Sequence, residues 1–302
     1  MAQRITTGEH ERSADARNRA TSLAPPDIIT SRENKWLKMF RAALRGTGPA
    51  KDEPIGVEGP KLIEDAVRSG LVAEALLVAT LGERELERIL QAATESEAGI
   101  PRSRILRTSE KLFASVTGTE SPQGVAALFK QHAWGFEDVL RGPGAMRQNQ
   151  PLVLVMAGVQ DPGNVGTIVR SAEAFGATAV VATRGTADPW SPKAFRASAG
   201  SALRLPLLRG IAIPVLLAQF KMARVKIFAA SSKAGHAEDM NVDFREPSAI
   251  FIGSEGAGLP PEVLQAADAT ISVPMNSTVE SLNAGVAASV ILFEAARQRK
   301  VR

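Results

Sequence analysis

Five long apolar segments in the second half of the chain constrain its fold more than any other feature. They read LVLVMAGV, TAVVAT, VKIFAASS, AIFIG and TISVPM, and helical patterns lie between them. Strands that are apolar on both faces belong in a parallel sheet that helices cover on each side. We therefore expect a mostly parallel α/β domain that ends in a long helix beginning at Ser281.

The first half of the chain shows the same alternation with shorter segments. The strand patterns PIGVEG, EALLVAT, SRILRT and GVAALFKQ alternate with helical patterns such as GPKLIEDAVRSG and ERELERILQAA. This alternation predicts a second, smaller α/β domain. A polar start and a later Gly- and Pro-rich stretch predict a disordered tail and a linker. The expected organisation is a tail over 1–28, a small domain over 29–130, a linker over 131–150 and a parallel α/β domain over 151–302.

The composition limits the chemistry that the chain can perform. It has no cysteine and only three histidines, His10, His132 and His236, so thiolate chemistry is excluded and no metal site is expected. No apolar run reaches the roughly 20 residues of a membrane helix, and the N-terminus lacks a secretory signal, so we expect no membrane association and a cytoplasmic location. The net charge of +4 suggests a polyanionic partner without proving one.

The stretch SRENKWLKMFRAALRG predicts an amphipathic helix with a basic outer side. Its apolar residues recur at helical spacing and form one face: Trp36, Leu37, Phe40 and Leu44. Its basic residues occupy the remaining faces: Arg32, Lys35, Lys38, Arg41 and Arg45. Such a helix either packs on a small domain with a solvated basic face or contacts RNA, and the sequence leaves both open.

Three loops that follow predicted strands carry an unusual set of glycines and polar residues. They read DPGNVGTIVRSAEAFGA, FIGSEGAGLP and VPMNSTVESLNAGVAAS. In open α/β sheets the ligand crevice lies outside the carboxyl ends of the strands, so we expect the three loops to converge. The glycines of the second loop read GxxGxG and depart from the GxGxxG pattern, which disfavours a nucleotide-dependent oxidoreductase.

Each loop also has a simpler local explanation. Glycines are common in turns after strands, and Asn164, Ser281 and Asn283 stand where helix caps occur. Arg170, about two turns into a predicted helix, has the position of an ordinary surface charge. These local explanations do not account for a carboxylate, Glu255, in so flexible a loop. Its position is explained only when the three loops are considered together.

In order and spacing, the three motifs resemble those of the SpoU-type (TrmH-like) RNA 2′-O-ribose methyltransferases of the SPOUT superfamily. This resemblance covers roughly residues 150–300, with a departure at Ser254, where the family usually has Asn or another small residue. The first half resembles the L30e-like substrate-binding domain of many members, through SRENKWLKMFRAAL, VEGPKLIEDAVRSG and TESPQGVAAL. The resemblance implies a deep trefoil knot in the C-terminal domain and a homodimer formed through that domain.

The resemblance further implies S-adenosylmethionine as methyl donor, a ribose 2′-hydroxyl as acceptor and no metal. It assigns catalysis to Asn164, Arg170, Glu255, Ser281 and Asn283. Methyl transfer from a sulfonium is an in-line displacement, so the enzyme helps by alignment and proton removal. Arginine is a poor base because it keeps its proton, so we expect Arg170 to hold the target phosphate and stabilise the developing alkoxide. We expect Glu255 to turn towards Arg170 and the two asparagines.

The resemblance also indicates which residues bind the cofactor and the RNA. The positions expected to line the cofactor pocket are Gly253, Val273, Met275 and Leu282. The basic residues expected to contact RNA are Arg32, Lys35, Arg41 and Arg196, and the stretch SPKAFRASAGSALRLP adds Lys193 and Arg204. Contacts to phosphates and 2′-hydroxyls are the usual means of distinguishing RNA from DNA.

Residues and resemblance together predict an RNA 2′-O-methyltransferase that acts on ribosomal RNA, with transfer RNA as the alternative substrate. A non-catalytic RNA-binding module that kept the fold is the alternative of another class. It is disfavoured because all five catalytic positions are retained. The last helix carries Leu282, Val286, Val290 and Phe293 on one face, which predicts either a two-fold interface or a core contact.

Overall fold

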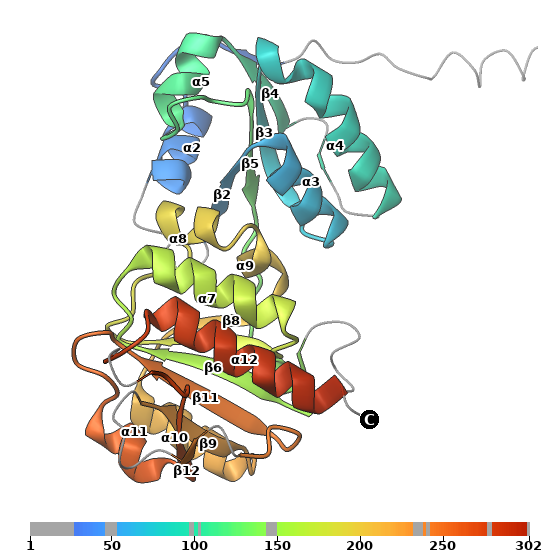
Figure 1. The fold of residues 1–302 in the computed structure, drawn as a ribbon. Helices are drawn as coiled ribbons and strands as arrows, with labels where there is room; N and C mark the ends of the chain where they lie inside the picture. Colours follow the sequence, from blue (N-terminus) through green and yellow to red (C-terminus); the bar gives the residue numbers. More distant parts are fainter. Residues whose placement is uncertain are drawn as a thin grey trace, which may run out of the picture.

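The computed structural model describes residues 27–45, 53–96, 100–101, 104–142, 150–231, 238–239, 242–276 and 280–300. The chain forms two sheets with helices on both faces, and Figure 1 shows α8 (Pro192–Ala197) and α9 (Ser201–Arg204) between them. The predicted α/β fold class is therefore confirmed. None of the described helices has the length and apolar character of a membrane-spanning segment. The predicted domain boundaries stay predictions, and the tail, up to residue 26, lies outside the described residues.

The N-terminal sheet has five strands in the order β1-β4-β3-β5-β2. They are β1 (Asp27–Ile29), β2 (Ile55–Glu58), β3 (Ala73–Ala79), β4 (Ile105–Thr108) and β5 (Val125–Phe129). Strand β3 pairs in parallel with β4 and antiparallel with β5, while β2 closes one edge antiparallel to β5. The sheet is therefore mixed, and its central strand β3 is buried on both faces.

Helices cover both faces of this sheet because alternate residues of β3 point to opposite sides. The helices are α2 (Lys35–Arg45), α3 (Pro60–Arg68), α4 (Glu83–Glu95) and α5 (Glu110–Val116), with a 3-10 turn, η1 (Thr80–Gly82), after β3. Leu76 and Val78 share a core with α3 and α4. Ala75 and Leu77 share a second core with α2 and α5.

The first of these helices, α2, is the amphipathic helix that the sequence predicts. Leu37, Phe40 and Leu44 are buried, which confirms the apolar face. From the basic side, Arg45 Nε donates to the Thr117 carbonyl oxygen at 2.6 Å and so ties α2 to the end of α5. Part of the basic charge of α2 is therefore used for packing.

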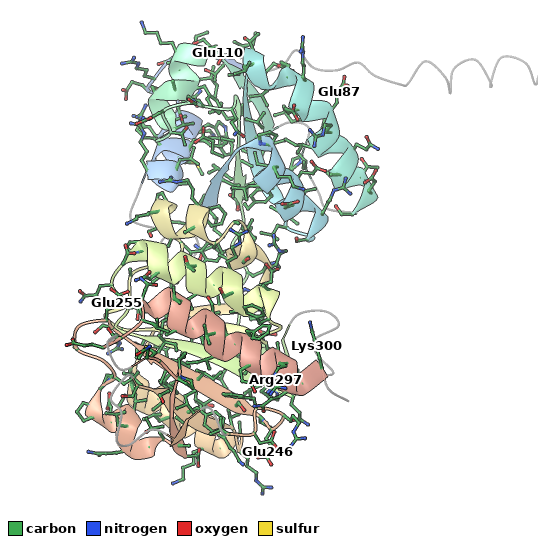
Figure 2. All side chains as sticks on the ribbon, in the orientation of Figure 1. Glu87, Glu110, Glu246, Glu255, Arg297 and Lys300 are labelled. Atoms are coloured by element: carbon green, nitrogen blue, oxygen red, sulfur yellow. The ribbon has the colours of Figure 1, made fainter. Side chains whose placement is uncertain are left out.

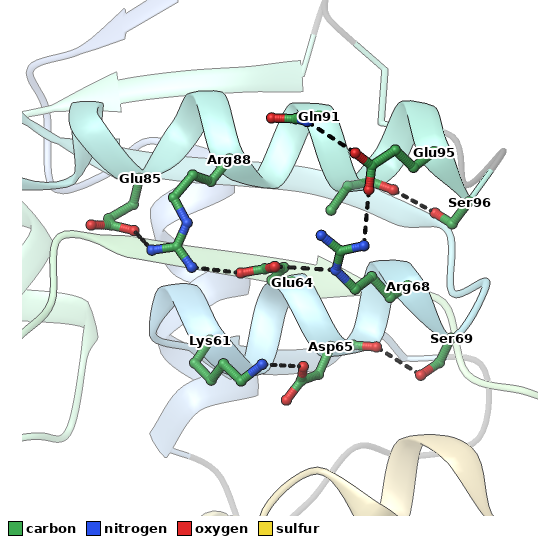
Figure 3. Close-up of polar contacts among 11 residues, drawn as sticks. Lys61, Glu64, Asp65, Arg68, Ser69, Glu85, Arg88, Gln91, Glu95 and Ser96 are labelled. Carbon is green, nitrogen blue, oxygen red and sulfur yellow. Dashed lines mark hydrogen bonds and ion pairs between the residues drawn. The ribbon is translucent and has the colours of Figure 1, made fainter.

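An ion-pair network joins α3 and α4 on the outer face of the N-terminal domain (Figure 3). Glu64 lies between Arg68 Nε, at 3.1 Å, and an Arg88 guanidinium nitrogen, at 2.9 Å. The same arginines reach Glu95 at 2.9 Å and Glu85 at 2.8 Å. Exposed pairs contribute only about 0.2–1 kcal/mol each. The network therefore orients the two helices, and the apolar core beneath them stabilises the domain.

The C-terminal sheet has seven strands in the order β10-β12-β9-β11-β6-β7-β8, and all of its pairings among the described residues are parallel. The strands are β6 (Leu152–Ala157), β7 (Ala179–Thr183), β8 (Leu207–Ile211), β9 (Lys226–Ala230), β10 (Glu238–Asp239), β11 (Ser248–Gly253) and β12 (Ala269–Ser272). The five apolar segments singled out in the sequence form β6, β7, β9, β11 and β12. The parallel sheet is therefore confirmed.

Two groups of helices cover the faces of this sheet. They are α6 (Phe136–Arg141), α7 (Pro162–Ala174), α10 (Ile213–Met222), α11 (Pro261–Ala266) and α12 (Ala284–Lys300). Leu154 and Met156 of β6 share a core with α7 and α12, whereas Val153 and Val155 share one with α10 and α11. Figure 1 shows α7 and α12 side by side across one face.

Small residues bring the helices on that face close together. The Ser171 and Ser289 hydroxyl oxygens are 2.7 Å apart, which joins α7 to α12. On the other side of α7, a Cβ on Gly166 would lie 2.2 Å from the Ala194 carbonyl oxygen of α8. Gly166 therefore permits backbone contact between α7 and α8, and α7 is held between two helices.

Three short elements lie where the sequence predicts none. β1 begins at Asp27, within the predicted tail, and is too short to show a pattern. β8 is an edge strand with partly exposed residues and a glycine, Gly210, at φ +68°, so it lacks a continuous apolar run. α6, in the predicted linker, lies between Gly135 and Gly142, which suggest turns. The deep trefoil knot stays a prediction.

Candidate functional site

The three motif loops meet at the carboxyl edge of the C-terminal sheet. Strands β6 and β11 are central neighbours and end in register, with Ala157 opposite Gly253. Asn164 lies in the first turn of α7 after β6, Glu255 follows β11, and Asn283 precedes α12. Figure 2 shows Glu255 at the opposite end of the domain from Arg297 and Lys300, the last turn of α12. The predicted convergence of the loops is confirmed.

Hydrogen bonds join one residue from each loop into a compact network. Glu255 Oε1 accepts from Asn164 Nδ2 at 2.8 Å and from Asn283 Nδ2 at 2.8 Å. It also accepts from the backbone N–H of Ala284 at 3.1 Å, in the first turn of α12. Asn283 Nδ2 donates a second bond to Asn164 Oδ1 at 2.9 Å. Glu255 is therefore the residue on which the other two loops are assembled.

The remaining hydrogen-bonding capacity of this network points outward. An amide group has two N–H donors, and Asn283 uses both, whereas Asn164 uses one within the network. The donors that reach the Glu255 carboxylate from described residues all go to Oε1. Among the described residues, one Asn164 N–H and Glu255 Oε2 thus have no partner and are available to a ligand, and Glu255 itself is exposed. A donor beside an acceptor suits a hydroxyl, which both accepts and donates.

The cap of α7 is Asp161, so the local explanation of Asn164 as a helix cap is wrong. Asp161 Oδ2 accepts from the Asn164 backbone N–H at 3.1 Å, which leaves the Asn164 side chain free for Glu255. Lys193 Nζ, from α8, lies 2.9 Å from Asp161 Oδ1. The Lys193 ammonium, with the Gly163 and Asn164 N–H donors, holds the pKa of the Asp161 carboxyl below its usual range. Asp-Pro before a helical pattern is a start signal that could have identified Asp161 from sequence.

Asn283 does cap its helix, as the local explanation held, but it also joins the network. Its Oδ1 accepts from the backbone N–H groups of Gly285 at 2.9 Å and Val286 at 3.2 Å. The amide oxygen therefore caps α12 while the amide nitrogen bonds to Asn164 and Glu255. This double use fixes the rotamer of Asn283 and the direction in which α12 leaves the site.

A cavity of about 260 Å³ opens beside the network, near the lower end of the usual range for ligand pockets. Its walls come from the ends of β9, β11 and β12, the glycine loop and the start of α12. All four residues that were predicted to line a cofactor pocket lie along it: Gly253, Val273, Met275 and Leu282. Glu255 and Ser281 also line it. The sequence did not single out Ala230 and Ser231, at the end of β9, because nothing in VKIFAASS distinguishes them.

Glycine is required at the base of the cavity. A Cβ on Gly253 would lie 2.3 Å from the Gly258 carbonyl carbon and 2.6 Å from the Leu259 nitrogen, so any side chain would displace the loop. Ser254 and Gly258 form a backbone bridge at 3.2 and 2.9 Å that closes the loop on itself. Gly258 has φ +71°, which favours glycine. The tight fold of the loop thus places its backbone groups, together with the Glu255 side chain, along the cavity.

Arg170 lies apart from this network, which corrects the expectation that Glu255 turns towards it. Arg170 is exposed on α7, and no hydrogen bond or ion pair joins it to the described residues. Six residues along a helix correspond to about 9 Å of rise and about 240° of rotation, so Asn164 and Arg170 face different directions. Ser281 lines the cavity, but no described hydrogen bond links it to Asn164, Glu255 or Asn283.

The basic residues expected to contact RNA fall into two groups. Arg32, Lys35 and Arg196 are exposed, although Lys35 Nζ lies 5.7 Å from the Trp36 ring centroid. Arg41 Nε contacts the Ser115 carbonyl oxygen at 3.5 Å and is half-buried. All four assignments stay predictions.

The two additional residues of the rim stretch have structural partners. Lys193 holds Asp161, and Arg204 forms a double hydrogen bond with Glu173 at 2.5 and 2.7 Å. Both side chains are therefore used in ion pairs within the protein, and their contact with RNA stays a prediction.

Two family models match the chain. A model described as the SpoU rRNA Methylase family matches residues 151–293, and one described as the MRM3-like substrate binding domain matches residues 50–127. The first match covers the parallel sheet with the three loops, and the second covers most of the N-terminal sheet.

Individual relatives match almost the whole chain. A Bacillus subtilis protein, 23S rRNA (guanosine(2553)-2'-O)-methyltransferase RlmP, is 31% identical over 88% of this chain and 97% of its own length. The AdoMet-bound rRNA methyltransferase structure from Sinorhizobium meliloti has a TM-score of 0.72 and 26% identity, over 91% of this chain and 98% of that one. The SpoU methyltransferase AviRb from Streptomyces viridochromogenes, in complex with AdoMet, has a TM-score of 0.71 and 26% identity, over 88% and 99%. The chain belongs to the SpoU rRNA methylase family.

Proposed function

We propose that this protein transfers a methyl group from S-adenosylmethionine to a ribose 2′-hydroxyl of ribosomal RNA. The observation that carries the proposal is the glycine-lined cavity beside the network of Asn164, Glu255 and Asn283. A cofactor in the cavity would have its reactive group next to a donor and an acceptor suited to a hydroxyl.

The residues around the cavity fit S-adenosylmethionine. Backbone groups of the loop after Gly253 can close around the adenine and the amino-acid tail, since the absence of a Cβ at Gly253 lets the loop fold back against Gly258 and Leu259. Val273, Met275 and Leu282 supply apolar contact on the other walls. When bound, the cofactor supplies an electrophilic methyl group on a sulfonium. No metal is needed for this reaction.

The polar residues of the site then act on the acceptor. The remaining Asn164 N–H donates to the ribose, and Glu255 Oε2 accepts a hydrogen bond from the 2′-hydroxyl, which orients the oxygen for in-line attack, and takes the hydroxyl proton as the oxygen is methylated. Ser281, on the cavity wall, hydrogen-bonds at the same place. Arg170, which lies apart from these groups on α7, binds the adjacent phosphate, because a guanidinium is a donor that keeps its charge.

The proposed homodimer has support in an apolar face of α12. Val286, Val290 and Phe293 are 48%, 36% and 56% exposed, so the alternative that they fill the core is wrong. The Phe293 ring contacts Phe175, the C-cap residue of α7, edge-on, with centroids 5.9 Å apart, which extends the apolar face to the end of α7. A second copy of the chain would bury this face across a two-fold axis.

Ribosomal RNA is the substrate we favour, and it implies a cytoplasmic site of action. The Bacillus subtilis relative is named for a guanosine in 23S rRNA and aligns over 97% of its length. Transfer RNA is the alternative, because a relative from Synechocystis, 32% identical, is named only as a tRNA/rRNA methyltransferase.

The test is transfer of labelled methyl from S-adenosylmethionine to RNA that lacks the modification, separated into ribosomal and transfer fractions. We expect label in ribosomal RNA as a 2′-O-methyl nucleotide, lost with Arg170→Ala. Arg141→Ala is the matched control, because Arg141 lies on α6 and is paired with Glu137 at 2.6 Å. Label in transfer RNA alone would show that transfer RNA, and not ribosomal RNA, is the substrate. RNA binding without label would favour the binding-module alternative.

A further inference from the structure

A second cavity, of about 310 Å³, lies in the crevice between the two domains. The N-terminal domain contributes residues from α2, β2, α3 and the loop before β5, and the C-terminal domain contributes α8 and the residues just before it. The residues that the following argument uses are Glu58, Lys61, Thr119, Trp190, Phe195 and Arg196. None of the catalytic or cofactor residues described above lines this crevice within the described part of the chain.

One wall of the crevice is apolar and aromatic. Trp190 and Phe195 lie against each other with ring centroids 6.1 Å apart and an interplanar angle of 25°. They are 9% and 5% exposed, so each presents only part of its ring to the crevice, and Leu44 and Leu62 of the N-terminal domain also line it. A wall of this kind favours a flat, apolar ring over a fully solvated ion.

The opposite side carries a half-buried carboxylate, Glu58 at the end of β2. Its Oε1 accepts from Thr119 Oγ1 at 2.8 Å, and the backbone N–H of Gln123 donates to the same carboxylate. Burial raises the pKa of Glu58, although these hydrogen bonds and the Arg196 charge oppose the shift. An ionised carboxylate is an acceptor only, with room for about four donors, so it calls for a ligand that presents N–H groups.

The rim of the crevice carries two basic side chains. Lys61 and Arg196 are exposed and lie on the two sides of the crevice, one from α3 and one from α8, and Lys61 is ion-paired with Asp65 at 2.9 Å. Two buried hydroxyls, Thr117 Oγ1 and Ser191 Oγ, have no hydrogen-bond partner among the described residues and are sequence neighbours of residues lining the crevice.

We infer that this crevice binds one unpaired nucleobase of the RNA substrate, with guanine as the base that fits best. The ring would lie against Trp190 and Phe195, its N–H groups would face Glu58, and the flanking phosphates would meet Lys61 and Arg196. Sequence-specific proteins read RNA chiefly through such splayed-out bases, held by aromatic contact and hydrogen bonds to the Watson–Crick edge. The inference rests on the proposed function, since it assigns a further contact to the same RNA.

Guanine is favoured by the pattern of its donors. Its N1–H and exocyclic N2–H₂ are adjacent and can both donate to one carboxylate. Uracil has a single N–H between two carbonyl oxygens, and those oxygens would face the Glu58 carboxylate. Adenine and cytosine each offer an amino group beside an acceptor nitrogen. A cationic peptide would also satisfy the carboxylate, but the Arg196 charge at the rim would repel it.

The crevice is mechanically linked to the methyl-transfer site through α8. Phe195 and Arg196 line the crevice, while Lys193 of the same helix holds Asp161, the cap of α7. The close contact of Gly166 with Ala194 fixes α8 against α7. A base in the crevice and a ribose at Asn164 would thus bind to two sides of one packed helix pair, which sets the spacing between the two nucleotides.

The test uses the full chain labelled with 5-fluorotryptophan, which gives ¹⁹F signals for Trp36, Trp134 and Trp190. GMP is expected to shift the Trp190 signal saturably, and UMP is expected to bind about tenfold more weakly, since a bidentate contact is worth about 1–3 kcal/mol. Glu58→Gln should remove this preference. Glu87→Gln, an exposed glutamate on α4 labelled in Figure 2, is the matched control and should retain it.

The outcomes separate this inference from the proposed function. No Trp190 shift with GMP, equal shifts with GMP and UMP, or a shift with a lysine-rich peptide only would each overturn the inference, whether or not Glu58→Gln folds. Methyl transfer by the same samples is measured in parallel. We expect Glu58→Gln to raise KM for RNA with kcat and S-adenosylmethionine affinity unchanged. A wild-type protein that binds GMP at Trp190 but transfers no methyl group would refute the proposed function instead.

Discussion

Arg299, near the end of α12, provides the sharpest test of how the last helix is held. Its guanidinium donates to the carbonyl oxygens of Phe244 at 2.7 Å, Gln150 at 2.5 Å, Pro151 at 2.9 Å and Glu246 at 3.0 Å. These carbonyls precede β6 and β11, the two central strands. Burial lowers the pKa of Arg299 to about 10. One side chain therefore ties the far end of α12 to the start of both strands that carry the site.

The expected loss in the free energy of unfolding follows from how exposed the four hydrogen bonds of Arg299 are. Those to Gln150 and Glu246 are exposed, so water can replace them, whereas those to Phe244 and Pro151 are partly buried. A hydrogen bond to a charged group is worth about 1.5–3 kcal/mol. Counting only the two partly buried bonds, Arg299→Ala should lower the free energy of unfolding by about 3 kcal/mol or more. This corresponds to a fall in Tm of roughly 6–12 °C for a domain of this size.

The assay is urea unfolding followed by circular dichroism, with Arg297→Ala as the control. Arg297 lies two residues away on α12, is exposed and, in the described part of the chain, pairs only with Glu294, at 2.7 Å, so its loss should cost less than about 1 kcal/mol. Arg299→Lys should be intermediate, because an ammonium cannot reach four carbonyls in a fork. Equal stability of Arg299→Ala and Arg297→Ala would refute the reasoning.

Three further predictions concern the site and the interface. Gly253→Ala puts a Cβ 2.3 Å from the Gly258 carbonyl carbon, so S-adenosylmethionine affinity should fall about 100-fold in calorimetry; an unchanged affinity would contradict the assigned pocket. Glu255→Gln sets an amide donor among the donors of Asn164 and Ala284, so methyl transfer should slow by about 10–100-fold with unchanged cofactor affinity; a wild-type rate would exclude the proposed role. Phe293→Asp should shift sedimentation from dimer to monomer while Phe293→Leu stays dimeric, and a dimer in both would place the interface elsewhere.

The sequence predicted the general geometry of the site well because parallel strands end at one edge. The apolar runs that became β6 and β11 placed Asn164 and Glu255 at neighbouring strand ends, 91 residues apart in the chain and 2.8 Å apart in space. The resemblance to the SpoU family then supplied the residues along the cavity. Gly253 lies along the cavity as the resemblance predicted, but the physical reason for a glycine there, its contact with Gly258, is visible only in the structure.

The features that the sequence did not predict depend on the direction in which side chains leave a helix and on contacts between the two domains. Arg170 and Asn164 belong to one motif, but helical geometry turns them to different faces, so of these two residues Glu255 contacts Asn164 and not Arg170. Asp161, and not Asn164, caps α7, because its side chain reaches back to the Asn164 N–H. The crevice at Glu58 joins residues more than 130 positions apart, among them Trp190, and no local pattern marks such a junction.

The most direct test of the proposed activity is a position-resolved map of ribose 2′-O-methylation in ribosomal RNA from cells with and without this protein. The account predicts that one methylated nucleotide disappears without the protein, returns with the wild type and does not return with Asn164→Ala. Identical maps in the presence and absence of the protein would contradict the assignment of ribosomal RNA 2′-O-methylation to this chain.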